Sequence, residues 1–247
     1  MKQLEITRFP VLDYISAEGM NTLVTNLSYC GPDIRKIMVT SRHASEGKSY
    51  VTMNLMRTLA GLGRRVVLVD ADLRASGIQA NYRLRCGSEF RLSGLSEYLS
   101  GHCELEEALY ETNIPGAHLI PAGHEAPNPL QLMVTEKMEK LMERLGEQYD
   151  VVLMDTPPVG ILADAVALAK YCDGALLVVG YRQGKQREIT DAVESIRQTG
   201  CKVLGAVLNE VRFKNLSNRH YYYNSKRYSS YYNKHYGQKK RGDDQQQ

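Results

Sequence analysis

One loop in the sequence carries a lysine and serines in an arrangement that suits phosphate groups. Residues 41–49 read Ser-Arg-His-Ala-Ser-Glu-Gly-Lys-Ser, after an apolar run and before a helical pattern. In such loops, backbone N–H groups and a helix N-terminus converge on negative charge, so we expect Lys48 to reach the outer phosphates and the Ser49 hydroxyl to bind Mg²⁺. The strict pattern has glycine where this chain has Arg42. The loop alone therefore leaves open a plain strand-to-helix turn with a solvated lysine.

Carboxylates follow two further apolar runs. Residues 66–69 lead into Asp70 and Asp72, and residues 151–154 lead into Asp155. In an open α/β sheet the ligand lies beyond the carboxyl ends of the strands, so the three aspartates should converge with the loop lysine at one edge. Mg²⁺ prefers one or two carboxylates together with water and substrate phosphates, which this set supplies. A single aspartate after a strand is also a common helix cap, but the three elements together predict a nucleotide site.

The elements that must position these residues alternate between strand-like and helical patterns, which is typical of a parallel sheet. The expected strands are continuous apolar runs, as for strands covered on both faces: Ile37–Thr40, Val66–Val69, His118–Ile120, Val151–Met154, Ala175–Val179 and Val203–Leu208. The expected helices are Lys48–Leu62, Leu130–Leu145, Ile161–Lys170 and Arg187–Thr199, with two shorter ones in Gly94–Leu109. The predicted fold class is α/β, a doubly wound, mainly parallel sheet with helices on both faces, as in P-loop NTPases.

The composition indicates a globular domain followed by a basic tail. The chain of 247 residues is 43% hydrophobic and 24% charged, and its five cysteines show no CxxC spacing. Together with the lack of an 18-residue apolar run or a signal-peptide pattern, this predicts a cytoplasmic protein without a disulfide framework or a zinc centre. Residues 212–247 hold nine Lys and Arg and two Asp, a net charge of +7, which leaves −4 for residues 1–211.

The basic segment also gathers seven of the sixteen tyrosines and almost no aliphatic side chains. It cannot bury enough apolar surface to offset its ordering entropy. We therefore expect a nucleotide-binding domain over residues 1–211 and a flexible, disordered tail over residues 212–247. The tyrosines of the tail are Tyr221, Tyr222, Tyr223, Tyr228, Tyr231, Tyr232 and Tyr236.

The combined motifs resemble a known family. S-x4-E-G-K-S, V-V-L-V-D-A-D-L-R, V-V-L-M-D-T-P-P and the tyrosine cluster are similar to those of the bacterial tyrosine kinases (BY-kinases) of capsule and exopolysaccharide synthesis, of the CpsD/CapB type. The resemblance covers nearly the whole chain. The first three motifs are shared with the related partition and division-site ATPases, so the tyrosine-rich tail is the discriminating feature.

The resemblance implies a protein-tyrosine kinase that uses ATP and Mg²⁺, phosphorylates its own tail tyrosines and regulates capsular or exopolysaccharide synthesis and export. It implies that one of Asp70 and Asp72 accepts the tyrosine proton while the other supports the metal. The nucleotide-binding residues that it implies are Glu46, Gly47, Lys48, Ser49 and, on the adenine side, Asn209. The implied metal ligands are Ser49, Asp72 and Asp155.

Partners are also implied by the resemblance. They are a membrane-bound activator of the polysaccharide co-polymerase type, which completes the nucleotide site, a cognate phosphatase, and tyrosine-containing substrates that include the chain itself. The expected location is the inner face of the cell membrane, reached through the activator. We expect no specific nucleic-acid partner, although interleaved basic residues and tyrosines also suit single strands.

The chain departs from the family pattern at three places, one of which is Tyr50, where threonine is usual. Ala44 and Ser45 replace Pro-Gly in the phosphate loop, so Ser45 must adopt whatever backbone angles glycine provided. The family's N-terminal helix, expected here at residues 16–29, carries E-x2-R-x2-R and joins subunits into rings, whereas Glu18 is followed here by Asn21 and Val24. Self-association is therefore expected to be weak. Two alternatives stay open: a partition-type ATPase switch for membrane or DNA positioning, and a nucleotide-binding scaffold with weakened catalysis.

Overall fold

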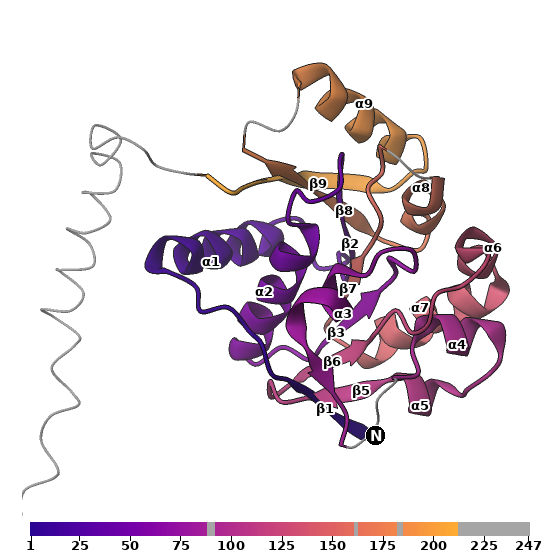
Figure 1. The fold of residues 1–247 in the computed structure, drawn as a ribbon. Helices are drawn as coiled ribbons and strands as arrows, with labels where there is room; N and C mark the ends of the chain where they lie inside the picture. Colours follow the sequence, from indigo (N-terminus) through magenta and orange to yellow (C-terminus); the bar gives the residue numbers. More distant parts are fainter. Residues whose placement is uncertain (88–91, 161–162, 182–184, 212–247) are drawn as a thin grey trace, which may run out of the picture. The chain divides into compact units, whose positions relative to one another are not determined.

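A nine-stranded sheet forms the centre of the computed structural model, which describes residues 1–87, 92–160, 163–181 and 185–211 (Figure 1). The strand order is β4-β1-β5-β6-β3-β7-β2-β8-β9. The strands are β1 (Lys2–Ile6), β2 (Lys36–Ser41), β3 (Val66–Asp70), β4 (Leu84–Arg85), β5 (Tyr110–Thr112), β6 (Ala117–Ile120), β7 (Val151–Asp155), β8 (Gly174–Gly180) and β9 (Lys202–Asn209). The domain boundary at residue 211 and the tail tyrosines lie at or beyond the end of the described residues and stay predictions.

The six strands expected from the sequence all form. They lie next to one another in the order β6-β3-β7-β2-β8-β9, and each neighbouring pair is parallel. The short strands β1, β4 and β5 were not expected, and β4 and β5 introduce the antiparallel pairs, with β1 and β6 respectively. The expectation that every strand is covered on both faces is wrong for β9. It lies at the edge of the sheet, and each of its residues is partly or fully exposed.

The helices are α1 (Tyr14–Ser28), α2 (Lys48–Gly61), α3 (Gly77–Tyr82), α4 (Leu95–Ser100), α5 (Leu105–Ala108), α6 (Pro129–Met133), α7 (Glu136–Gln148), α8 (Ala163–Ala169) and α9 (Gln186–Arg197). The single helix expected over Leu130–Leu145 is in fact two, α6 and α7. The break occurs because the Thr135 side chain accepts a hydrogen bond from Met138 N and so starts a new helix.

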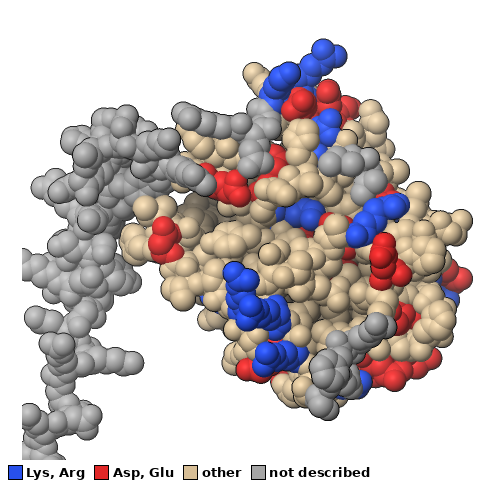
Figure 2. All heavy atoms as spheres, in the orientation of Figure 1, with Lys and Arg blue, Asp and Glu red and all other residues tan. Residues whose placement is uncertain are grey.

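Two hydrophobic cores lie on opposite faces of the sheet. Along β3, Val66 and Leu68 belong to the core that α1, α2 and α3 cover, whereas Val67 and Val69 belong to the core that α4 to α9 cover. Alternate residues of a strand point to opposite faces, so a fully buried strand contributes to both cores. The doubly wound arrangement predicted from the sequence is confirmed. On the flank that α4–α7 form, most of the surface in Figure 2 is uncharged, and its charged side chains are mainly acidic.

Candidate active site

The phosphate loop joins the carboxyl end of β2 to the N-terminus of α2. Gly47 has φ +84°, and a Cβ there would overlap the side-chain amide of Asn209, so the position requires glycine. Ser45 has φ +62°, which is the left-handed conformation that its place in the loop predicts. A non-glycine residue held in this region costs about 1–3 kcal/mol, so the replacement of glycine by serine is accommodated at an energetic cost.

Glu46 and Asn209 hold the loop in shape. The Glu46 side chain is buried, and its carboxylate accepts hydrogen bonds from His43 N at 2.8 Å and Gly180 N at 3.3 Å. Asn209 Nδ2 donates to Glu46 O at 3.0 Å. Both residues were predicted to bind nucleotide. In the structure their side chains contact the backbone of the loop and its surroundings, which gives them a clear part in fixing the loop's conformation.

The carboxylates expected to converge do so at the carboxyl ends of β3 and β7. Lys48 Nζ lies 2.8 Å from Asp72 Oδ2, and Ser49 Oγ donates to Asp155 Oδ2 at 2.5 Å. Asp70 and Asp155 are partners in the parallel β3–β7 register. All three aspartates are buried. The structure therefore brings together the lysine, the serine and the three carboxylates that the sequence predicts to form one site.

Residues after β3 complete this arrangement and were not identified from the sequence. The Ser76 hydroxyl donates to Asp70, and Ala75 N donates to Asp72 Oδ1 at 3.1 Å. A Cβ at Gly77 would lie 2.6 Å from Ser49 Oγ, so glycine permits α3 to approach the loop. Serine and glycine are common in any turn, so the sequence held no signal that would single them out.

Negative charge exceeds positive charge in this site. Burial raises the pKa of Asp70, and the neighbouring Asp155 adds to the effect. Burial likewise raises the pKa of Asp155, although Lys48 and Ser49 oppose the shift. For Lys48 burial lowers the pKa, but Asp155 and Asp72 outweigh it, so the pKa is raised and the lysine stays cationic. The described residues form no cluster of three or more carboxylate, His or Cys side chains arranged around a metal ion. The hydroxyl of Ser49 beside the carboxylate of Asp155 still fits Mg²⁺, which takes one or two carboxylates together with water and phosphate oxygens.

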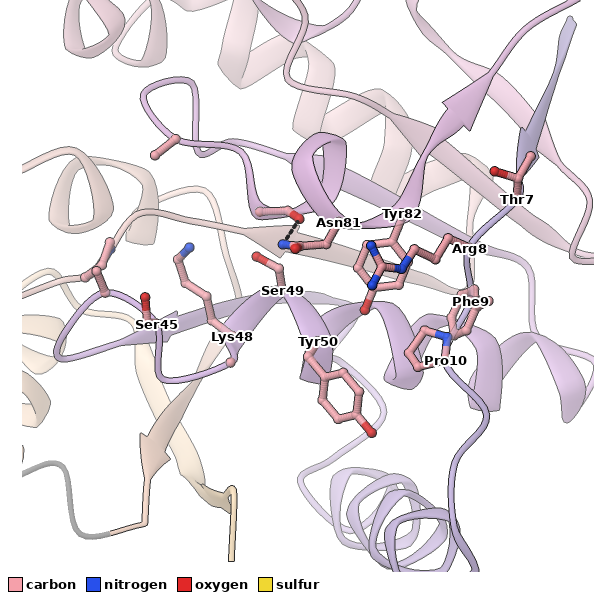
Figure 3. A pocket seen from close by; sticks show the side chains of 15 residues that line it. Thr7, Arg8, Phe9, Pro10, Ser45, Lys48, Ser49, Tyr50, Asn81 and Tyr82 are labelled. Carbon is pink, nitrogen blue, oxygen red and sulfur yellow. Dashed lines mark hydrogen bonds between the residues drawn. The ribbon is translucent and has the colours of Figure 1, made fainter.

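A pocket of about 680 Å³ opens beside the loop. It extends from Ser45, Lys48 and Ser49 to Arg8 and Tyr82, and it is large enough for a nucleotide-sized ligand (Figure 3). In Figure 3 the side chains of Lys48 and Ser49 point to the same side, and the Tyr50 ring points away from them. The contribution of the N-terminal segment could not be foreseen, because Arg8 is brought here by strand pairings with distant parts of the chain.

The chain is similar to known proteins over most of its length. Residues 34–199 match the AAA domain family. The tyrosine-protein kinase CpsD of Streptococcus agalactiae serotype III (strain NEM316) is 34% identical over 194 residues, which are 78% of this chain and 82% of that protein. The kinase domain of the Escherichia coli tyrosine kinase ETK superposes with a TM-score of 0.72 at 27% identity, over 81% of this chain and 78% of that one.

The cell division ATPase MinD of Pyrococcus furiosus superposes less well. Its TM-score is 0.60 at 26% identity, over 70% of this chain and 71% of that one. The difference favours a kinase over an ATPase switch.

No helix in the described residues is both long and apolar enough to cross a membrane.

Proposed function

This chain belongs to the family of bacterial tyrosine-protein kinases, and from that premise we propose which residues transfer the γ-phosphoryl group of ATP and where it is placed. The observation that carries the proposal is the convergence of Lys48 and Ser49 with Asp72 and Asp155. A loop lysine, a hydroxyl and carboxylates at the ends of adjacent strands are the parts that phosphoryl transfer requires, since the protein mainly positions the groups and stabilises charge.

We assign each side chain a role on the basis of its surroundings. Lys48 remains protonated and would bind the outer phosphates, while Ser49 and Asp155 would hold Mg²⁺ with the help of Asp72. When bound, Mg²⁺ neutralises charge on the phosphates. Asp70 is buried beside them at the end of β3, and we assign it the role of accepting the proton of the attacking phenol.

The acceptors that we propose are the seven tyrosines between Tyr221 and Tyr236, on this chain or on a second copy. Family membership further supports a role in capsular or exopolysaccharide synthesis and export. The partners proposed on the same ground are a membrane-bound activator of the co-polymerase type and a cognate phosphatase. The activator would hold the kinase at the inner face of the cell membrane.

The test is to incubate the purified full chain with ATP and Mg²⁺ and to map phosphate by mass spectrometry. We expect phosphotyrosine confined to Tyr221–Tyr236. ATP hydrolysis without any phosphotyrosine would instead support the partition-type switch. Failure to bind ATP with Mg²⁺ in calorimetry would support the scaffold, in which Ala44 and Ser45 have weakened the phosphate loop.

A further inference from the structure

A second pocket lies at the same edge of the sheet as the active site. It has a volume of about 330 Å³, and the residues that line it include Ser96, Glu97, His124 and Glu125. The loop after β6 forms one wall. Because Val69 of β3 is the register partner of Ile120 of β6, this loop leaves the sheet one strand away from Asp70, or about 5 Å in the sheet. The pocket therefore opens at the edge of the sheet that also carries the proposed catalytic carboxylates.

The buried hydroxyl of Ser96 indicates that this pocket takes a polar ligand. Ser96 is only 5% exposed, and its hydroxyl has no hydrogen-bond partner in the part of the chain that the structure describes. A buried hydroxyl without a partner costs about 1–3 kcal/mol, so such groups are rare unless a ligand or water completes them. The backbone of a docked peptide could supply the missing partner.

The charge of the pocket indicates which peptide it suits. Glu97 Oε1 lies 2.6 Å from His124 Nδ1, whereas exposed Glu125 has no ion pair within the described residues. The surrounding segment, residues 94–150, holds eleven Asp and Glu against three Lys and Arg, a net charge of −8. Acidic side chains accordingly predominate among the charged side chains on the flank of α4–α7 in Figure 2.

We propose that this pocket docks the basic tail, residues 212–247, of a second copy of the chain. The tail carries +7, and its basic residues are interleaved with the tyrosines: Lys226 and Arg227 lie between Tyr223 and Tyr228. Docking of the basic residues at Glu97 and Glu125 would hold the tyrosines at the edge of the sheet that carries the active site, which raises their local concentration there. The inference rests on the proposed function, because it identifies how that site selects its acceptor.

The experiment measures binding and turnover separately. A fluorescent peptide with the sequence of residues 214–241 is titrated with the full-length protein, and the same peptide serves as acceptor in steady-state kinetics. Glu125→Lys is compared with Glu147→Lys, a matched charge reversal on the last turn of α7, at the opposite edge of the sheet near the start of β7. A second peptide with every Lys and Arg replaced by Gln tests the dependence on charge.

We expect Glu125→Lys to raise both the Kd and the KM of the basic peptide about three- to tenfold. The kcat, the KM for ATP and all values for the neutral peptide should stay within about twofold of wild type. Glu147→Lys should have little effect. Equal weakening by the two variants, or an unchanged Kd in Glu125→Lys, overturns the docking site.

Failure of the proposed function has a different signature. If no peptide is phosphorylated by the wild type but Glu125→Lys still weakens binding selectively, docking is retained and the kinase assignment is lost. If phosphorylation proceeds but Glu125→Lys raises only the KM for ATP, the pocket belongs to the nucleotide site and the proposal is wrong.

Discussion

Lys48 lies at the point where the phosphate loop meets the carboxylates, and its loss should stop the reaction. We expect Lys48→Met to lower autophosphorylation at least about 100-fold. Charged hydrogen bonds contribute about 1.5–3 kcal/mol in the ground state and more against developing charge. The matched control is Lys140→Met, because Lys140 also pairs with a carboxylate, Glu136 at 2.6 Å, but on the exposed face of α7. Quantitative phosphotyrosine mass spectrometry should show full activity for the control. A folded Lys48→Met protein with normal activity would refute the site.

The role that we propose for Asp70 comes with an energetic cost. It is one of three buried carboxylates with a single neighbouring lysine, so removal of its charge should relieve repulsion. We expect Asp70→Asn to abolish phosphorylation and to raise the free energy of unfolding of the nucleotide-free protein by about 1 kcal/mol.

Urea unfolding at neutral pH without Mg²⁺ measures this effect. Asp150→Asn is the control, since Arg65 donates to Asp150 at 2.8 Å and lowers the pKa of that carboxyl, so its loss should destabilise the protein by about 0.5–1 kcal/mol. If Asp70→Asn destabilises the protein to the same degree and leaves activity intact, Asp70 is a cap and not a base.

Among the helices and strands, the sequence predicted those that are determined by the local pattern of apolar and polar residues. The six parallel strands and α2 follow from continuous apolar runs and a helical period, and the site residues stand at their ends. The short strands were missed because β1 is held by pairs such as Lys2 with Tyr110, more than 100 residues away. For the same reason Arg8 and Tyr82, which line the large pocket, could not be assigned. The left-handed conformation of Ser45 was predictable only because a motif fixed its position in a turn.

Replacement by alanine should change the stability of the protein in opposite directions at two glycines, one in the loop after β6 and one in α1. Gly123 follows β6 with φ +86°, and a Cβ there would overlap Glu97 Oε2 and Ser96 Oγ. Gly19 lies in α1 with nothing within 4 Å of the added Cβ. We expect Gly123→Ala to lower the free energy of unfolding by about 1–3 kcal/mol, and Gly19→Ala to raise it by about 0.5–1 kcal/mol. Urea unfolding of both variants measures the difference. A tolerated Gly123→Ala would show that the loop after β6 can rearrange.

At the scale of the whole molecule, the surface of α1 bears on assembly. The helix forms close to where it was expected, and it presents exposed Asn21 and half-buried Val24 where the family pattern has arginines. Without these two charges we expect a monomer or a small, labile oligomer at micromolar concentration in the absence of an activator. Light scattering measures the mass. A stable ring of about eight subunits would show that other residues have taken over the contact.

The charge of the tail should make assembly depend on the number of phosphates. Residues 212–247 carry +7, and each phosphotyrosine adds about −1.5 to −2 at neutral pH. About four phosphates therefore neutralise the tail, and all seven bring it to about −4 to −7. Attraction to the acidic flank and to the carboxylates of the active site then becomes repulsion, so a phosphorylated tail should leave. We expect self-association and binding to anionic vesicles to fall in steps with phosphate number.

A series of Tyr→Phe variants, compared at matched phosphate counts, separates this charge effect from a single privileged tyrosine. The variants keep the tail's length and basic residues, so only the number and place of the phosphates change. If charge count governs release, variants with equal phosphate numbers should associate equally, whichever tyrosines remain. The differences should shrink at high salt, because exposed charges interact over a Debye length of only about 8 Å at 0.15 M ionic strength. One substitution that reproduces the whole effect, or equal association of unmodified and fully phosphorylated protein at low salt, would contradict the charge-count mechanism.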